Sequence, residues 1–288
     1  MLLLESRLKQ VLAIAVALLT SVAAHASPVE VYAAGDIADC SRVTAAESDA
    51  AATVRLIPTD ATVLVLGDVL YVPPTLANYR SCYGPTWGAH LAETLAVPGN
   101  HDYAGGRADA FFEYFYGSTS GPGYFSRRVG SWLVIGLDSN LRDASLDEQF
   151  HWLEATLATQ PDARCTLVLW HAPLYSSGPH RGSGEHMRRF WQALDTFGAD
   201  LVLNGHEHFY EAFEPRDGQG APAANGMREF VVGTGGATLY GFWRPPYSSR
   251  VRIKRHGVLH LTLDDDAYAW QFIDVQGKVA DTGRALCR

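Results

Sequence analysis

Short apolar runs recur along this chain, and polar residues follow each run within a few positions. A run without regular polar alternation is typical of a strand buried on both faces, as in a parallel sheet covered by helices. The strands predicted in this way cover residues 29–34, 63–66, 95–98, 132–137, 166–170 and 201–203. Later segments at 229–232, 256–263 and 268–275 are predicted as further short strands.

Helical patterns lie between several of these strands. Capping-box patterns begin at Thr44 and Ser145, and the first predicted helix ends before Pro58. Apolar residues at helical spacing follow the second box: Leu146, Phe150, Leu153 and Leu157. Two more helices are predicted over 107–116 and 185–197. Because strands alternate first with helices and later with strands, we predict a layered α/β fold. One sheet is mostly parallel, and the C-terminal strands form or join another.

The first 26 residues are predicted to be a secretory signal peptide. Arg7 and Lys9 precede an apolar run over 11–19, and residues 24–26 have the small-x-small form of a cleavage site. The run is shorter than the roughly 20 residues of a spanning helix, although an uncleaved anchor is the alternative. Residues 27–288 are predicted to form a single secreted or periplasmic domain, with no membrane segment after cleavage.

Charge and cysteine content narrow the possible partners. The formal net charge of −8 argues against non-specific binding to nucleic acids or anionic membranes. Four cysteines in an exported chain favour two disulfides, and their spacing resembles no zinc motif. Three pairings are possible, of which we predict Cys40–Cys82 with Cys165–Cys287.

Oxygen and imidazole donors follow five of the predicted strands: Asp36, Asp68, Asn100, His171 and the pair His206 and His208. Ligands of open α/β sheets bind beyond the carboxyl ends of the strands, so neighbouring strands would bring these side chains together. The mixture of donors suits Zn, Mn, Fe or Ni rather than Ca. Because the donors are too many for one tetrahedral ion, we predict two ions that share a carboxylate. Taken singly, each residue could instead be a turn former or a hydrogen-bonded core residue.

The same residues carry a resemblance to a known family. The ordered motifs of the calcineurin-like metallophosphoesterases resemble five segments of this chain: Asp36, Gly67-Asp68-x-x-Tyr71, Gly99-Asn100-His101-Asp102, His171 and Gly205-His206-x-His208. Tyr71 points to the purple acid phosphatase branch, and so do residues 123–126, 149–153 and 233–236. The resemblance implies a four-layer αββα sandwich, in which helices flank two mixed β-sheets.

The resemblance also implies two sets of metal ligands. The first ion would be held by Asp36, Asp68, Tyr71 and His208. The second ion would be held by Asp68, Asn100, His171 and His206, so that Asp68 bridges the two ions. Two residues depart from the pattern of the branch. Ala38 replaces the usual Gly, and Glu207 is an unusual acidic neighbour of the paired histidines, without an assigned role.

Tyr71 decides which ions are expected. A free phenol has a pKa of about 10, so its ionisation as a ligand requires a strong Lewis acid. We therefore expect Fe(III) beside a divalent Fe, Zn or Mn ion, with a visible charge-transfer band. The alternative is a pair of divalent ions, with Tyr71 as ordinary packing beside them.

The resulting hypothesis is an exported phosphatase that hydrolyses small phosphomonoesters. The two ions would neutralise the phosphate oxygens and provide a metal-bound hydroxide as nucleophile. His101 would protonate the leaving group as general acid, and Asp102 would orient its imidazole. A phosphodiesterase or nucleotidase with the same metals is the first alternative, and a non-catalytic metal-binding protein is the second. His180, His186 and Tyr175 could also reach the cleft.

Overall fold

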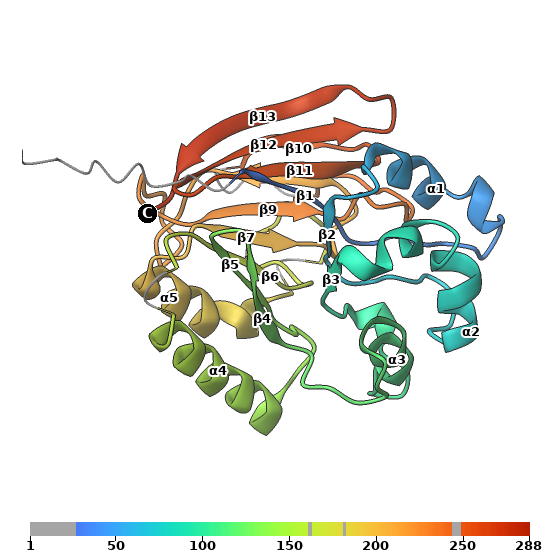
Figure 1. Ribbon diagram of the computed structural model, residues 1–288, viewed down its shortest axis with the longest axis horizontal. Coiled ribbons are helices and arrows are strands. Elements are labelled where there is room, and N and C mark those ends of the chain that lie inside the picture. Colours follow the sequence, from blue (N-terminus) through green and yellow to red (C-terminus); the bar gives the residue numbers. More distant parts are fainter. Residues whose placement is uncertain (1–26, 161–162, 181–182, 244–248) are drawn as a thin grey trace, which may run out of the picture.

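Two β-sheets stack face to face, and helices lie outside them (Figure 1). The computed structural model describes residues 27–160, 163–180, 183–243 and 249–288. The predicted signal peptide lies outside these described residues. The arrangement confirms the predicted α/β class and the sandwich of mixed sheets that the resemblance implies.

The first sheet has six strands in the order β13-β12-β11-β1-β2-β3. Its parallel half contains β1 (Val29–Ala34), β2 (Thr62–Val65) and β3 (Thr94–Ala96). Its antiparallel half contains β11 (Gly257–Leu263), β12 (Ala267–Asp274) and β13 (Val279–Leu286). The two halves meet where β1 pairs with β11, so the sheet joins early and late parts of the chain.

The second sheet has seven strands in the order β10-β8-β9-β7-β6-β5-β4. Its parallel centre contains β5 (Trp132–Gly136), β6 (Thr166–Leu169), β7 (Leu201–Asn204) and β9 (Arg228–Val232). Its antiparallel margins contain β4 (Phe125–Val129), β8 (Tyr210–Phe213) and β10 (Ser249–Ile253). The C-terminal strands therefore join both sheets and do not form one of their own.

Apolar side chains on the two faces of the second sheet belong to different cores. Leu167 and Leu201 face the first sheet and share a core with Val31 and Val63. Residues that alternate with them in the strands, such as Val168, face the helices on the outer side. That face is covered by α4 (Asp143–Ala158) and α5 (Arg188–Phe197). The helices beside β2 and β3 are α1 (Asp49–Thr53), α2 (Leu76–Asn78) and α3 (Asp109–Tyr116) (Figure 1).

The predicted helix after Thr44 is interrupted. Thr44 N donates to Glu47 Oε2 over 3.2 Å, as the capping box requires. Ser48 then adopts an extended backbone, and its hydroxyl donates to Ala45 O over 2.7 Å. Because this local hydrogen bond competes with helix continuation, only short helical segments follow.

One of the helix boundaries predicted on the second sheet is wrong, and another is confirmed. The cap predicted at Ser145 is wrong, because its hydroxyl donates to Arg142 O and α4 already begins at Asp143. The predicted end of α5 is confirmed, since Gly198 closes the helix in a left-handed conformation with φ 81°. Within the described ranges, no helix is long and apolar enough to cross a membrane.

Both predicted disulfides are present. Cys40–Cys82 ties the loop after β1 to the helical turn Tyr79–Tyr83. Cys165–Cys287 ties the start of β6 to the end of β13 and therefore links the two sheets.

Leu194 on α5 provides a test of the outer core. Its side chain is fully buried among apolar neighbours, so Leu194→Ala should lower the free energy of unfolding by about 2–5 kcal/mol. Phe197→Ala is the matched control on the same helix, because Phe197 is 50% exposed. Its cost should stay below about 1 kcal/mol. Urea unfolding measures both values, and equal costs would contradict this packing.

Candidate metal centre

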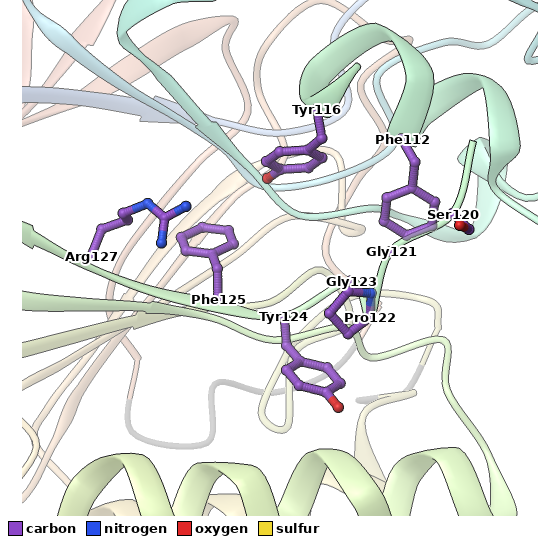
Figure 2. Close-up of a pocket in the computed structure, with 9 residues that line it drawn as sticks. All are labelled: Phe112, Tyr116, Ser120, Gly121, Pro122, Gly123, Tyr124, Phe125 and Arg127. Carbon is purple, nitrogen blue, oxygen red and sulfur yellow. The ribbon is translucent and has the colours of Figure 1, made fainter. Parts of the chain in front are cut away.

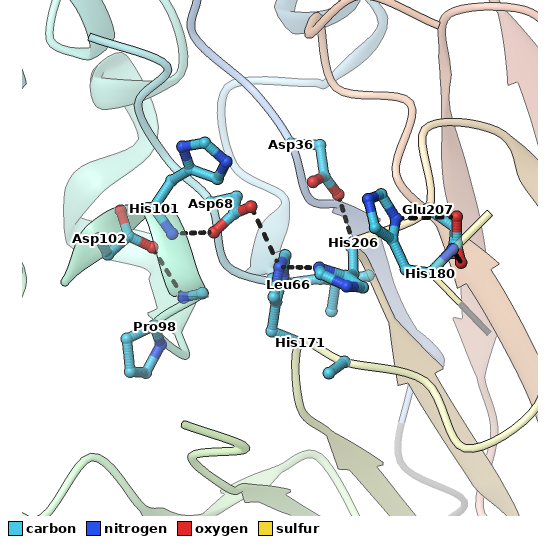
Figure 3. A network of polar contacts seen from close by, with 12 residues as sticks. Asp36, Leu66, Asp68, Pro98, His101, Asp102, His171, His180, His206 and Glu207 are labelled. Atoms are coloured by element: carbon cyan, nitrogen blue, oxygen red, sulfur yellow. Dashed lines mark hydrogen bonds and ion pairs between the residues drawn. The ribbon is translucent and has the colours of Figure 1, made fainter. Parts of the chain in front are cut away.

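The predicted ligands come from the carboxyl ends of strands in both sheets (Figure 3). Asp36 and Asp68 follow β1 and β2 of the first sheet, whereas His171 follows β6 of the second. His206 and His208 follow β7. The strands are therefore not neighbours in one sheet, but their ends meet at the seam between the sheets. A hydrogen bond crosses this seam, because His206 N donates to Asp36 Oδ2 over 2.7 Å.

The backbone turns sharply at three of these positions. Asp36, Asp68 and His206 have φ angles of 59°, 49° and 71°, in the left-handed region that residues with a side chain rarely adopt. Hydrogen bonds between the loops support this conformation, since Asp36 N donates to Gly67 O and Ile37 N donates to Asp68 O, each over 3.0 Å. Such conformations cost about 1–3 kcal/mol each and concentrate at functional sites.

Glycine permits the closest contacts between these loops. Gly67 is left-handed, with φ 84°, and a Cβ at this position would lie 2.7 Å from both Gly99 N and His171 Nδ1. A Cβ on Gly99 would collide with the Asp68 carboxylate. Neither position accommodates a side chain, so the packing of the site itself requires glycine in both motifs.

One group of donor atoms surrounds the Tyr71 hydroxyl. Tyr71 Oη lies 2.6 Å from Asp36 Oδ1 and 2.7 Å from His208 Nε2. His208 Nε2 and Asp36 Oδ1 are 3.2 Å apart. The Tyr71 hydroxyl also lies 3.2 Å from Asp68 Oδ2. Tyr71 therefore contacts the other three residues of the first predicted ligand set.

A second group surrounds His171. Its Nε2 lies 3.2 Å from Asp68 Oδ2 and 3.1 Å from His206 Nδ1. Ligand atoms of Asp68, His171 and His206 all lie within 4.8 Å of one another, a spacing compatible with one metal ion. Asp68 Oδ2 thus contacts both groups, which is the arrangement expected of a carboxylate that bridges two ions.

The outer nitrogens of two histidines are anchored to backbone carbonyls. His171 Nδ1 donates to Leu66 O over 2.8 Å, and His208 Nδ1 donates to Thr238 O over 2.7 Å. These bonds fix the orientation of each ring and direct its Nε2 lone pair toward the other donors when the imidazole is neutral. Oriented imidazoles beside buried carboxylates form a donor set that fits transition-metal ions.

The electrostatics of the cluster favour positive charge. Burial opposes the ionisation of Asp36 and Asp68, but neighbouring histidines hold the pKa of both carboxyls below its ordinary value. Burial also opposes protonation of His171, yet the charges of Asp68 and Asp36 raise the pKa of His171 to about 9. Burial raises the pKa of Tyr71 well above its ordinary value, and both carboxylates add to this effect. Two anionic groups in a buried space therefore require compensating cations.

The turn Asn100–Asp102 follows β3 and borders the two donor groups. Asn100 and His101 are exposed, and among the described residues no hydrogen bond joins the Asn100 amide to the other predicted ligands. His101 N donates to Asp68 Oδ1 over 2.7 Å, and the His101 ring packs on Tyr71 with centroids 4.5 Å apart. Asn100 as a ligand stays a prediction.

The contacts of Asp102 differ from its predicted role beside the His101 imidazole. The Asp102 carboxylate accepts hydrogen bonds from Gly99 N at 2.8 Å, from Val69 N at 3.1 Å and from the Tyr79 hydroxyl at 2.6 Å. With both oxygens engaged, Asp102 fastens the loop after β3 to the loop after β2. It therefore positions the backbone of two motifs instead of an imidazole ring.

Three further residues surround the ligands. The His180 ring packs against the His206 ring with centroids 4.6 Å apart. Glu207 is fully buried, and its carboxylate accepts a hydrogen bond from His180 N at 3.0 Å (Figure 3). Tyr240 stacks on His208 with centroids 4.5 Å apart, and its hydroxyl donates to His206 O over 2.7 Å. No sequence pattern marks Tyr240, apart from its position shortly after the glycine-rich turn at 233–236.

His186 and Tyr175, the other residues that could have reached the cleft, contact different parts of the fold. His186 Nε2 donates to Ser139 O over 2.7 Å. Tyr175 lies under the guanidinium of Arg216, with 4.3 Å between the guanidinium carbon and the ring centroid. All three candidates lie in or beside the same irregular segment after β6, so sequence pattern alone could not separate His180 from them.

A separate pocket of about 260 Å³ lies between α3 and β4 (Figure 2). Its larger lining side chains are Phe112, Tyr116, Tyr124, Phe125 and Arg127. The lining contains none of the predicted metal ligands, so this mainly aromatic pocket and the metal centre are distinct sites.

The chain resembles purple acid phosphatases in sequence and in fold. It is 29% identical over 194 residues to purple acid phosphatase 21 of Arabidopsis thaliana, a match that covers 59% of this chain and 44% of the relative. The structure of purple acid phosphatase PPD1 from yellow lupin (Lupinus luteus) seeds has a TM-score of 0.74 at 19% identity, covering 91% of this chain and 54% of that one. GAP50, the anchor in the inner membrane complex of Plasmodium, has a TM-score of 0.69 at 15% identity, covering 91% and 90%.

The chain spans less than half of the length of the plant purple acid phosphatases it matches. At their low identities the structural matches concern the fold, and they confirm two mixed sheets flanked by helices. The model of the calcineurin-like phosphoesterase family matches residues 15–210, which include every predicted metal ligand. This chain therefore belongs to the calcineurin-like phosphoesterase family, and within that family it is similar to the purple acid phosphatases.

Proposed function

We propose that this chain is an exported, metal-dependent phosphatase that hydrolyses phosphomonoesters. The observation that carries the proposal is the pair of donor groups that meet at Asp68, because a shared carboxylate suits two adjacent ions. Membership of the calcineurin-like phosphoesterase family supports hydrolysis of phosphate esters. Two disulfides support a secreted or periplasmic location, since such bonds persist in oxidising compartments.

The two groups would hold one ion each. The first ion would be bound by Asp36, Asp68, Tyr71 and His208, and the second by Asp68, Asn100, His171 and His206. When bound, the ions supply positive charge for the phosphate oxygens and a nucleophile derived from water. The chain contributes rigidity, because the ligands sit on strand ends and two of their imidazoles are anchored to backbone carbonyls.

Two histidines border the ligands and are exposed enough to contact a substrate. We assign to His101, which packs on Tyr71, the donation of a proton to the leaving oxygen. We assign to His180, whose side chain is 46% exposed beside His206, a contact with a phosphate oxygen. An accessible imidazole suits both tasks, because its ring nitrogens can donate a hydrogen bond or a proton to an oxygen.

We also propose that the first ion is Fe(III) and that the second is a divalent Fe, Zn or Mn ion. The Tyr71 hydroxyl contacts two other ligands of the first set at 2.6 and 2.7 Å, which supports its role as a ligand. A phenol with an ordinary pKa of about 10 gives up its proton to water when its oxygen binds a strong Lewis acid, and Fe(III) is such an ion.

Hydrolysis of p-nitrophenyl phosphate and of bis(p-nitrophenyl) phosphate tests the proposed activity. The purified protein should contain about two metal ions per chain, should cleave the monoester faster, and should lose activity when a chelator removes the ions. Faster cleavage of the diester would instead favour a phosphodiesterase with the same metals. Bound metal without cleavage of either ester would favour a non-catalytic metal-binding protein.

Tyr71→Phe tests the identity of the first ion. The substitution should abolish the visible charge-transfer band, because phenylalanine has no oxygen to bind Fe(III). Absorption spectra and metal analysis of the same samples separate loss of the ligand from loss of the ion. Tyr124→Phe is the control, since Tyr124 packs on Trp152 away from the ligands. A band that persists without the Tyr71 hydroxyl would exclude Tyr71 as the chromophore.

His101→Ala tests the general acid. The variant should retain its metals and lose about 10²- to 10⁴-fold in kcat for esters with poor leaving groups, such as phenyl phosphate. The loss should be smaller for p-nitrophenyl phosphate, whose leaving group needs little protonation. His151→Ala, at an exposed position of α4, should leave both rates unchanged. Equal losses for both esters would argue against proton donation by His101.

A further inference from the structure

The segment between β6 and α5 carries His180 to the metal centre. We call residues 172–180 the His180 loop. It contains no regular strand or helix, so its shape depends on the hydrogen bonds that its backbone makes with other parts of the fold. Two buried acids supply such bonds: Glu207, which lies between the paired histidines, and Glu211 on β8.

Glu207 contacts the end of the His180 loop with both carboxylate oxygens. Its Oε1 accepts a hydrogen bond from His180 N at 3.0 Å, and its Oε2 lies 3.2 Å from His180 Nδ1 (Figure 3). Gly178 permits this approach, because a Cβ there would collide with the Glu207 carboxylate. The fully buried Glu207 therefore exchanges contacts with water for contacts with a single residue of the loop.

Glu211 contacts the middle of the loop in a similar way. Its Oε2 accepts a hydrogen bond from Ser177 N at 2.9 Å, and its Oε1 accepts one from the Ser177 hydroxyl. Glu211 is also fully buried. The two carboxylates thus bind the loop backbone at two points, Ser177 and His180.

The opposite side of the His180 loop contacts the chain that follows β9. Trp243 N donates to Ser177 O over 2.9 Å. The Tyr240 hydroxyl lies 3.1 Å from His180 Nδ1 and donates to His206 O. The imidazole of His180 is therefore surrounded by Glu207, Tyr240 and the ring of His206.

Packing alone does not explain a buried acid at position 207. An apolar side chain of similar volume would fill the space without the free-energy cost of removing a carboxylate from water. Fully buried acids are rare unless their oxygens are engaged, and both oxygens of Glu207 contact His180. The contacts indicate that Glu207 acts on the position of one imidazole.

We propose that Glu207 and Glu211 are positioning residues that fix the His180 imidazole on the substrate side of the metal centre. Glu207 accepts a hydrogen bond from Nδ1, which leaves Nε2 to contact a phosphate oxygen. Glu211 acts less directly, by fixing Ser177 and hence the path of the loop. The kinetic consequence rests on the proposed phosphatase function, whereas the hydrogen bonds can be tested without a substrate.

Residue-specific amide hydrogen exchange in the purified protein tests these hydrogen bonds. Glu207→Ala should raise the exchange rate of the His180 amide about tenfold or more, and Glu211→Ala should do the same for the Ser177 amide. Amides of the central strands β5 and β6 should keep their rates. Unchanged exchange at His180 and Ser177, or an equal increase throughout the protein, would overturn the proposal.

Two further variants complete the exchange experiment. Glu207→Gln preserves the volume of the side chain, so it replaces the alanine variant if that variant does not fold. Its neutral amide oxygen is a weaker acceptor than a carboxylate. The exchange rate of the His180 amide should therefore rise in this variant too, but less than in Glu207→Ala. Glu185→Gln removes an exposed carboxylate that pairs with Arg188 and should change neither amide.

A double-mutant cycle tests the kinetic consequence for a phosphomonoester. Glu207→Ala should lower kcat/KM about 10- to 100-fold while the metal content is retained, because a displaced catalytic group loses most of its effect. In a His180→Ala background, the same substitution should change kcat/KM less than about twofold, since it acts through His180. Losses that multiply would show that Glu207 acts independently of His180 and would overturn the proposal.

Partial rescue distinguishes positioning from a general structural role. Glu207→Gln should lose less kcat/KM than Glu207→Ala, because its amide oxygen can still accept the hydrogen bond from His180 Nδ1. No recovery, with metal content and fold intact, would contradict positioning by that hydrogen bond. If the wild-type protein cleaves no phosphate ester, the proposed function fails, and the exchange pattern alone decides whether the two acids hold the loop.

Discussion

A buried carboxylate that faces two groups of donors cannot stay charged without nearby positive charge, and Asp68 is in this position. The groups that meet at Asp68 contain a second buried carboxylate, a phenol and three imidazoles. Removing such anions from water costs several kcal/mol each unless cations or strong hydrogen bonds compensate. The geometry of the site follows from this requirement, because its donors lie at distances that an ion can span.

The requirement is met by parts of the chain that belong to different sheets. Asp36 and Asp68 come from the first sheet, and their partners His171 and His208 come from the second. Two hydrogen bonds cross the seam between the sheets. His206 N donates to Asp36, and the His171 ring donates to the backbone after β2. The packing between the two sheets therefore sets the spacing of the ligands, because a small shift of one sheet relative to the other would change it.

Local sequence signals predict most of the fold and the cluster of ligands, whereas contacts between distant residues escape them. Asp36 and Asp68 could be predicted because each follows an apolar run at a strand end. The partners of Asp102 and Glu207 could not, since Tyr79 and His180 approach them only in the folded chain. Four strands were also missed: β4, β8, β10 and β13. Three of these are sheet edges, where charged residues such as Arg252 hide the strand pattern.

The pairing of β1 with β11 has a consequence for the biosynthesis of this protein. During synthesis β1 and β2 emerge from the ribosome well before β11, β12 and β13, so half of the first sheet is missing until those strands have been made. Such long-range pairing slows folding, because segments far apart in the sequence must find each other. The loop that carries Asp36 follows β1, so β1 has a neighbouring strand on both sides only after β11 has joined the sheet.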